Sequence, residues 1–117
     1  MVNWPYIAGF FDGEGCISQT GGQFRVTISQ KLRLPLEKIQ AFLIAEGIES
    51  KIKLSASKSR AVPMYNLTIF KKRAIEPFLT GVRPYLLVKK QQAEDLWRYL
   101  RLFPIRTKEK MNGGSGD

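Results

Sequence analysis

Residues 7–15 constrain the fold of this 117-residue chain more than any other segment, and they read Ile-Ala-Gly-Phe-Phe-Asp-Gly-Glu-Gly. Apolar residues at positions 7, 10 and 11 follow the spacing of a buried helical stripe. Gly9 and Gly13 lie four residues apart on another face, with Ala8 beside them. That face carries almost no side-chain bulk, so a second backbone can approach it closely. We predict that two copies of this helix pack together through Ala8, Gly9, Asp12 and Gly13.

Two carboxylates, those of Asp12 and Glu14, stand where this helix is expected to end, before Gly15. Acids at a helix C-terminus oppose its partial negative charge, at a cost on the order of 0.3–1 kcal/mol each. We therefore expect a role other than folding for them, and divalent cations bind carboxylates. A helix turns about 100° per residue, so the two side chains point about 200° apart and cannot share one metal within a chain. Two packed copies bring one acid from each to a shared position, which predicts a homodimer.

Histidine is absent and Cys16 is the single cysteine. Histidine-dependent nucleophilic catalysis is therefore excluded, and so are zinc sites built on His or Cys. A catalyst of this composition depends on carboxylates with a hard cation, together with Lys, Arg and polar groups. The lone cysteine excludes an intrachain disulfide and is typical of a reducing compartment. With no secretory signal evident, we expect an intracellular location, either the prokaryotic cytoplasm or an organelle matrix.

The chain carries 19 Lys and Arg against 10 Asp and Glu, for a net charge of +9. The excess is concentrated in residues 31–90, which hold thirteen basic and four acidic residues. A basic surface of this kind favours nucleic acid as the partner, and the alternative is a solvated face that serves solubility. No apolar run approaches the roughly 20 residues of a membrane span, so we expect no membrane partner.

Hydrophobic periodicity and turn residues predict one α+β domain over residues 1–105 and a flexible polar tail over 106–117. A helix runs from an N-cap at Asn3 to about Gly13. The order is α-β-β-α-β-β-α, with a small helix inserted before the last one and a mobile loop over 56–63. The remaining elements are predicted as strands 16–20 and 24–30, a helix 35–47, strands 50–56 and 64–70, a short helix 72–80 and a final helix 88–103.

The four strands are expected to form one antiparallel sheet with the helices on one face. Apolar and polar residues alternate along the strands, so the other face is polar and donor-rich. Such a face suits the DNA major groove, where base edges are read by hydrogen bonds. An ordinary solvated sheet face is the alternative. The candidate DNA-binding residues are Ser18, Thr20, Gln23, Arg25, Thr27, Lys51, Lys53, Ser55, Asn66 and Thr68.

Residues 7–15 resemble the LAGLIDADG motif of a family of homing endonucleases. Ile7 replaces the first Leu, aromatics occupy positions 10 and 11, Gly13 replaces Ala and Glu14 replaces the second Asp. The resemblance extends over roughly residues 4–103 and indicates the single-motif, homodimeric branch. It implies that Glu14 and the backbone carbonyl of Gly13 bind divalent cations (Mg²⁺, or Mn²⁺ or Ca²⁺, the last in a non-cleaving complex). Asp12 looks more like a structural acid.

Three further catalytic positions follow from the same resemblance. The segment 83–93 resembles the stretch before the family's last helix, where a lysine approaches the active site, and this lysine is Lys89. Gln30 resembles the polar residue that positions solvent near the metals, and Arg33 is the candidate for its basic partner. A surface role without catalytic function is the alternative for all three residues.

The resemblance implies an intron-encoded, site-specific double-strand DNA endonuclease that hydrolyses phosphodiester bonds with a divalent metal. As a homodimer it would act on a pseudo-palindromic site and need no small-molecule substrate. The alternatives are an intron RNA maturase, a catalytically silent DNA-binding protein on the same fold, and the isolated half of a two-motif enzyme.

Overall fold

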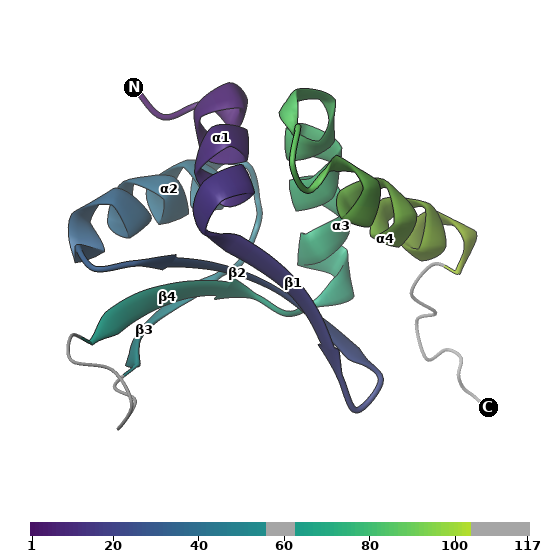
Figure 1. Ribbon diagram of the computed structural model, residues 1–117, viewed down its shortest axis with the longest axis horizontal. Coiled ribbons are helices and arrows are strands. Elements are labelled where there is room, and N and C mark those ends of the chain that lie inside the picture. Colours follow the sequence, from purple (N-terminus) through teal and green to yellow (C-terminus); the bar gives the residue numbers. More distant parts are fainter. Residues whose placement is uncertain (56–62, 104–117) are drawn as a thin grey trace.

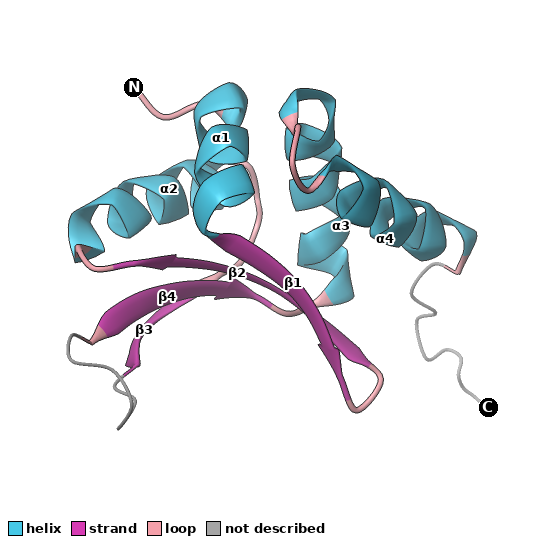
Figure 2. Cartoon of the chain, viewed as in Figure 1, coloured by secondary structure: helices cyan, strands magenta, loops and turns pink. Residues whose placement is uncertain are grey.

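Four strands form one curved antiparallel sheet, and the helices cover only one of its faces (Figures 1 and 2). The computed structural model describes residues 1–55 and 63–103. The strand order in the sheet is β1-β2-β4-β3. The elements in chain order are α1 (Trp4–Glu14), β1 (Gly15–Thr20), β2 (Gln23–Gln30), α2 (Arg33–Ala45), β3 (Lys51–Ser55), β4 (Met64–Ile69), α3 (Lys72–Val82), the short 3-10 helix η1 (Arg83–Tyr85) and α4 (Lys90–Leu102).

The predicted α+β architecture is confirmed, with the four strands and the helices in the expected order. Several boundaries differ by one or two residues; α2, for example, begins at Arg33 instead of Pro35. The short helix expected over 72–80 continues to Val82 and passes into η1 at Pro84. The last helix begins at Lys90 instead of residue 88, because the backbone before it is held in another conformation by the end of α1.

Local sequence signals account for several element ends. Asn3 caps α1, since its side chain accepts a hydrogen bond from the Tyr6 backbone N–H at 2.9 Å. Gly21 and Gly22 both have positive φ, which the tight β1–β2 turn requires. Gly47 also has positive φ and ends α2.

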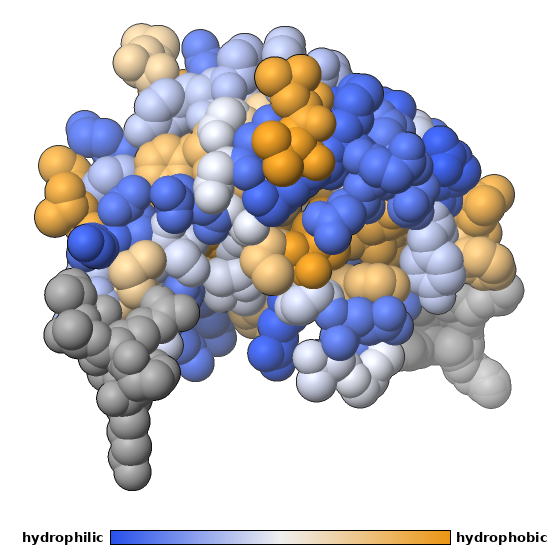
Figure 3. Space-filling view, in the orientation of Figure 1, coloured by the Kyte–Doolittle hydropathy of each residue, from blue (hydrophilic) through white to orange (hydrophobic). Residues whose placement is uncertain are grey.

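The core lies between the helices and the inner face of the sheet. An aromatic chain joins α1 to its neighbours: Trp4 meets Phe42 of α2 at 5.2 Å between ring centroids, edge to face, and Phe11 meets Phe78 of α3 at 5.6 Å. Val26 is among the fully buried sheet residues. Over α4 the outer surface is mainly hydrophilic (Figure 3). These contacts hold α1 upright on the sheet, with its C-terminal end leading directly into β1 (Figure 1).

Some predicted features lie outside the described residues. These are most of the predicted loop 56–63, the domain boundary at 105 and the polar tail 106–117. Within the described residues, no helix has both the length and the apolar character needed to cross a membrane.

Candidate functional site

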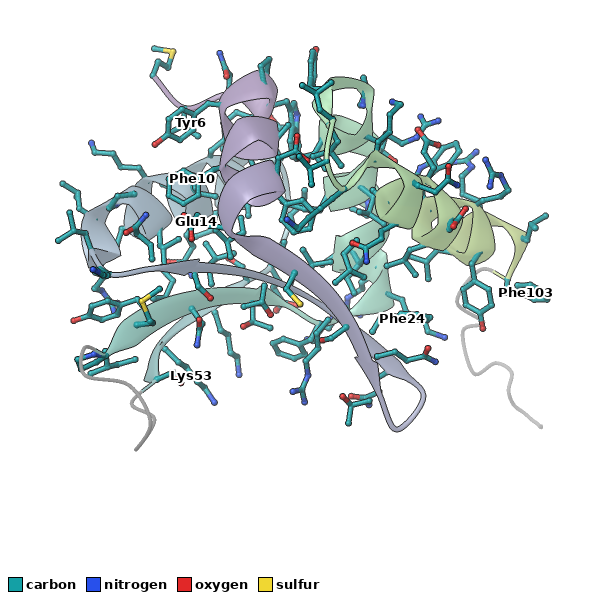
Figure 4. The ribbon with its side chains drawn as sticks, viewed as in Figure 1. Tyr6, Phe10, Glu14, Phe24, Lys53 and Phe103 are labelled. Atoms are coloured by element: carbon teal, nitrogen blue, oxygen red, sulfur yellow. The ribbon has the colours of Figure 1, made fainter. Side chains whose placement is uncertain are left out.

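The exposed side of α1 combines bare backbone with an acid at its end. Glu14 is the last residue of α1 and is exposed, on the same side of the helix as Phe10 and Tyr6 (Figure 4). In the neighbouring row, Gly9 and Gly13 are exposed, and a Cβ atom at either position would meet no atom within 4 Å. The predicted glycine face is therefore open, and it ends beside an exposed carboxylate.

Ala8 does not belong to this face, and our prediction for it is wrong. Its side chain is fully buried in the core of its own chain, as are those of Ile7 and Phe11. Phe10, which we placed on the buried stripe, is only partly buried. The inward stripe of α1 is thus rotated toward Ala8 relative to the prediction, because Trp4 and Phe11 pack against α2 and α3.

Asp12 faces the segment that precedes α4. Its carboxylate accepts hydrogen bonds from the backbone N–H groups of Leu87 (2.7 Å), Val88 (3.1 Å) and Lys89 (3.0 Å). Lys89 is the N-cap residue of α4 and has no side-chain cap of its own, so Asp12 satisfies donors at this helix end. We expected the acids of α1 to have a role other than folding, and for Asp12 this expectation is wrong. The structural role of Asp12 agrees with what the family resemblance implies.

The charge of Asp12 is stabilised by these donors. Burial raises the pKa of the Asp12 carboxyl, but the N–H groups of Lys89, Leu87 and Val88 and the positive charge of Lys89 outweigh burial. The net result is a pKa below its ordinary value of 3.8. Asp12 is thus held as an anion that faces its own chain.

Lys89 completes a reciprocal contact with Asp12. Its Nζ atom donates a hydrogen bond to the Asp12 backbone carbonyl at 2.7 Å. That carbonyl belongs to the last turn of α1, where the helix offers no N–H partner. The side chain also lies over Phe11, with Nζ 6.0 Å from the ring centroid. The structure therefore places the Lys89 ammonium at the Asp12 carbonyl, in the last turn of α1, and Asp12 precedes Glu14 by two residues. The catalytic role of Lys89 stays a prediction.

Gln30 lies at the end of β2 that faces α1. In the β1–β2 ladder Gly15 pairs with Ile28, so Gln30 continues the strand toward the end of α1. Its Oε1 atom accepts a hydrogen bond from the Lys31 backbone N–H at 2.8 Å. The strand register places Gln30 near the C-terminal end of α1, but within the described residues its side chain makes no hydrogen bond to Glu14.

Arg33 is engaged elsewhere. Its Nε atom donates to Glu37 at 2.7 Å within α2, and its guanidinium lies 5.7 Å from the ring centroid of Tyr65. Half of the side chain remains exposed. The structure thus does not bring Arg33 to Glu14 within one chain, and its catalytic role stays a prediction with less support than that of Lys89.

The oxygen donors at the end of α1 fit a hard cation in kind but not in number. The Glu14 carboxylate and the Gly13 carbonyl are the ligand type that Mg²⁺ prefers, and Mg²⁺ takes about six oxygens. Among the described residues, 1–55 and 63–103, no three acids, cysteines or histidines gather to hold a metal. A complete site would need oxygens from a second copy, from a phosphate or from water.

All the candidate DNA-binding residues lie on the outer face of the sheet, because they occupy alternate positions along each strand and pair with one another across the strands. Thr27 faces Thr68, Thr68 faces Lys51, and Lys53 points away from the helices (Figure 4). A hollow of about 280 Å³ opens on this face. Its lining residues are Arg25, Lys51, Lys53, Thr68 and Phe70.

The outer face of the sheet also holds residues that were not among the predicted ones. Phe70 follows Thr68 by two positions, so strand alternation places it on the same side, and it is 37% exposed with the Lys51 Nζ atom 5.5 Å from its ring centroid. Ser29 donates a hydrogen bond to the Asn66 side chain at 2.6 Å. The same period of two along the strands identifies Ser29 and Phe70 as residues of this face.

Comparison with known proteins agrees with this geometry. A family model described as the LAGLIDADG-like domain matches residues 4–82, from the start of α1 to the end of α3. The chain belongs to this family. A comparison with curated proteins found no match.

Two solved structures with a similar fold are crystal structures of the homing endonuclease I-CvuI. One is a complex with the I-CreI target in the presence of 2 mM Mg, in which the DNA is not cleaved. Its match to this chain has a TM-score of 0.66 and 19% sequence identity, and the aligned region covers 92% of this chain and 69% of the I-CvuI chain. The other is a complex with its own target in the presence of 2 mM Ca. Its match has a TM-score of 0.66 and 20% sequence identity, and it covers 86% of this chain and 67% of the I-CvuI chain. This LAGLIDADG-like chain therefore shares the fold of a homing endonuclease.

Proposed function

We propose that this chain is a site-specific double-strand DNA homing endonuclease that acts as a homodimer. One observation carries the proposal: an exposed acid, Glu14, ends a helix with an open glycine face, and the Lys89 ammonium is fixed at the same helix end. Membership of the LAGLIDADG-like family and the fold of a DNA-bound homing endonuclease support it.

The two surfaces of the molecule divide the task in this proposal. The polar face of the sheet reads the bases of one half-site in the major groove. The glycine faces of two α1 helices pack together, so that both Glu14 carboxylates stand over the central minor groove. Two copies related by a two-fold axis then require a pseudo-palindromic target.

The reaction is hydrolysis of one phosphodiester bond in each strand. Glu14 and the Gly13 carbonyl are the groups that would hold a divalent cation, which when bound stabilises negative charge on the phosphate. The Lys89 ammonium adds positive charge at the same helix end, where it stabilises the phosphate oxygens or tunes the attacking water. Because the chain has no histidine, we propose that the proton of the attacking water passes to bulk solvent.

Replacement of Glu14 by Gln tests the metal role. Glu14→Gln should abolish cleavage in Mg²⁺ while leaving DNA affinity intact, because it removes a charged ligand and leaves the sheet unchanged. Glu46→Gln, at an exposed acid just after α2, is the matched control and should cleave normally. Cleavage by Glu14→Gln at the wild-type rate would refute the role of this residue.

Two other functions on the same fold remain alternatives. An intron RNA maturase would keep the basic sheet without needing Glu14, and a silent DNA-binding protein would need neither Glu14 nor Lys89. Incubation of the protein and Mg²⁺ with a plasmid library of random inserts, followed by sequencing of any cut ends, separates them. Cuts at one pseudo-palindromic sequence support the endonuclease, and intact plasmids favour the alternatives.

A further inference from the structure

A basic ledge follows β4 at the start of α3. Lys71, Lys72 and Arg73 are consecutive, and the last two are exposed. With Phe24 and Phe70, among others, they line a hollow of about 600 Å³. We call the three residues Lys71, Lys72 and Arg73 the α3 ledge.

The stability of the fold does not explain the α3 ledge. Cations at a helix N-terminus oppose its partial positive charge, at a cost of about 0.3–1 kcal/mol each, and the first turn of α3 holds no acid. Lys71 pairs with Glu49 at 3.0 Å. Within the described residues, no ion pair engages Lys72 or Arg73. Two cations are thus presented to solvent at the end of the helix that favours anions.

The α3 ledge is continuous with the polar face of the sheet. Phe70 lines both the 280 Å³ hollow on that face and the 600 Å³ hollow beside the ledge. Lys51 lies over the same ring. Six of the residues that line these hollows have cationic side chains, and Glu49 is the acidic residue next to them. The cations are Arg25, Lys51, Lys53, Lys71, Lys72 and Arg73.

We propose that the α3 ledge binds the phosphate backbone of the duplex whose bases face the sheet. This inference rests on the proposed function, which supplies the duplex. Lys and Arg side chains gathered on one surface can each neutralise a phosphate of DNA, and such contacts fix position without reading sequence. The protein therefore grips its target over a surface wider than the four strands, and the ledge adds affinity while the sheet supplies specificity.

The test is DNA binding by a variant in which the two exposed cations, Lys72 and Arg73, are both neutralised. Lys72→Gln with Arg73→Gln should weaken binding by roughly tenfold on cognate and unrelated duplexes alike, and should make the slope of log K against log[salt] shallower by about 1–2. The matched control neutralises two exposed cations on other helices, Lys38→Gln with Arg98→Gln, and should leave the slope unchanged. Thermal melting of each variant establishes that it is folded.

Each outcome decides the inference. A shallower slope with an unchanged ranking of duplexes supports it, and Lys72→Glu with Arg73→Glu should then weaken binding further. An unchanged slope in a variant whose wild type binds and cleaves DNA overturns the ledge and leaves the endonuclease standing. If the wild-type protein binds no duplex, the ledge and the proposed function both fail.

Discussion

The two acids of α1 have different roles, and the residues each one meets explain why. Asp12 binds backbone N–H groups that are 75 to 77 positions away in the sequence, whereas Glu14 is exposed. The helical period correctly placed them on different sides of the helix. The period alone does not reveal that Asp12 has a partner, because that contact depends on how the segment before α4 packs. The unfavourable position of both acids at a helix C-terminus therefore suggested a functional role for each of them.

Replacement of Asp12 tests its role in the fold. Asp12→Ala should lower the free energy of unfolding near neutral pH by roughly 1–3 kcal/mol, because it leaves three N–H groups without their charged acceptor. The folded-state pKa of Asp12 is lowered, so its contribution is present above its unfolded pKa near 3.8 and is lost as the pH falls through the folded value. Denaturant titrations at several pH values should show the two proteins converging in acid.

Asp95→Ala is the matched control, since this carboxylate is 61% exposed, with Arg98 at 3.5 Å and a hydrogen bond from the Gln91 side chain at 2.8 Å, both on the surface of α4. It should change stability by less than about 0.5 kcal/mol. A stability loss in Asp12→Ala that stays constant down to strongly acidic pH would show that the charge of Asp12 is not what stabilises the fold.

Lys89 is tested by comparison with its neighbour in the chain. Lys89→Met should slow cleavage at least about tenfold with DNA affinity nearly unchanged, because it removes positive charge at the end of α1. Lys90→Met is the control: its Nζ atom bonds to the Arg83 carbonyl at 3.0 Å, away from that site. Single-turnover cleavage rates measure both, and equal rates for Lys89→Met and the wild type would make Lys89 an ordinary surface residue.

At the scale of elements, periodicity and turn residues predicted the type and order of the helices and strands, and long-range contacts set their ends. Asn3 and Gly47 were recognised as helix boundaries because capping is local. The start of α4 was misplaced because Asp12, far away in the sequence, fixes the backbone at Val88 and Lys89. The prediction that Ala8 lies on the open face of α1 was wrong because α1 packs against both α2 and α3, which widens its buried side.

A substitution on the open face of α1 should affect the stability of the chain and its self-association in opposite directions. Gly9→Ala should raise the stability of the isolated chain by up to about 1 kcal/mol, since alanine is the better helix former and its methyl group meets nothing. It should weaken self-association by roughly tenfold, because the methyl group separates the two backbones. Sedimentation and thermal melting measure the two effects.

Gly81→Ala is the matched control in α3. There the added methyl group would overlap the Trp4 ring, so the same substitution should lower stability. If Gly9→Ala dimerises as strongly as the wild type, the glycine face of α1 is not the interface.

At the scale of the whole molecule, the sequence predicted one antiparallel sheet with helices on one side and a polar face on the other, because alternation within each strand reports its two faces. The continuation of that face over Phe70 to the α3 ledge was not predicted. It depends on the order β1-β2-β4-β3, which brings residues from β2, β3 and β4 around one ring. The order of strands in a sheet depends on long-range packing, and it cannot be predicted from local sequence patterns.

We propose that one chain supplies half of a catalytic centre, and co-expression of wild-type and Glu14→Gln chains is the direct test. If Glu14 is required from both partners, an equal mixture should retain roughly a quarter of the double-strand cleavage activity, because randomly paired chains form wild-type homodimers in that proportion. Activity that falls only to roughly half, in proportion to the wild-type chain, would show that each chain acts alone and that the two chains do not share a catalytic centre.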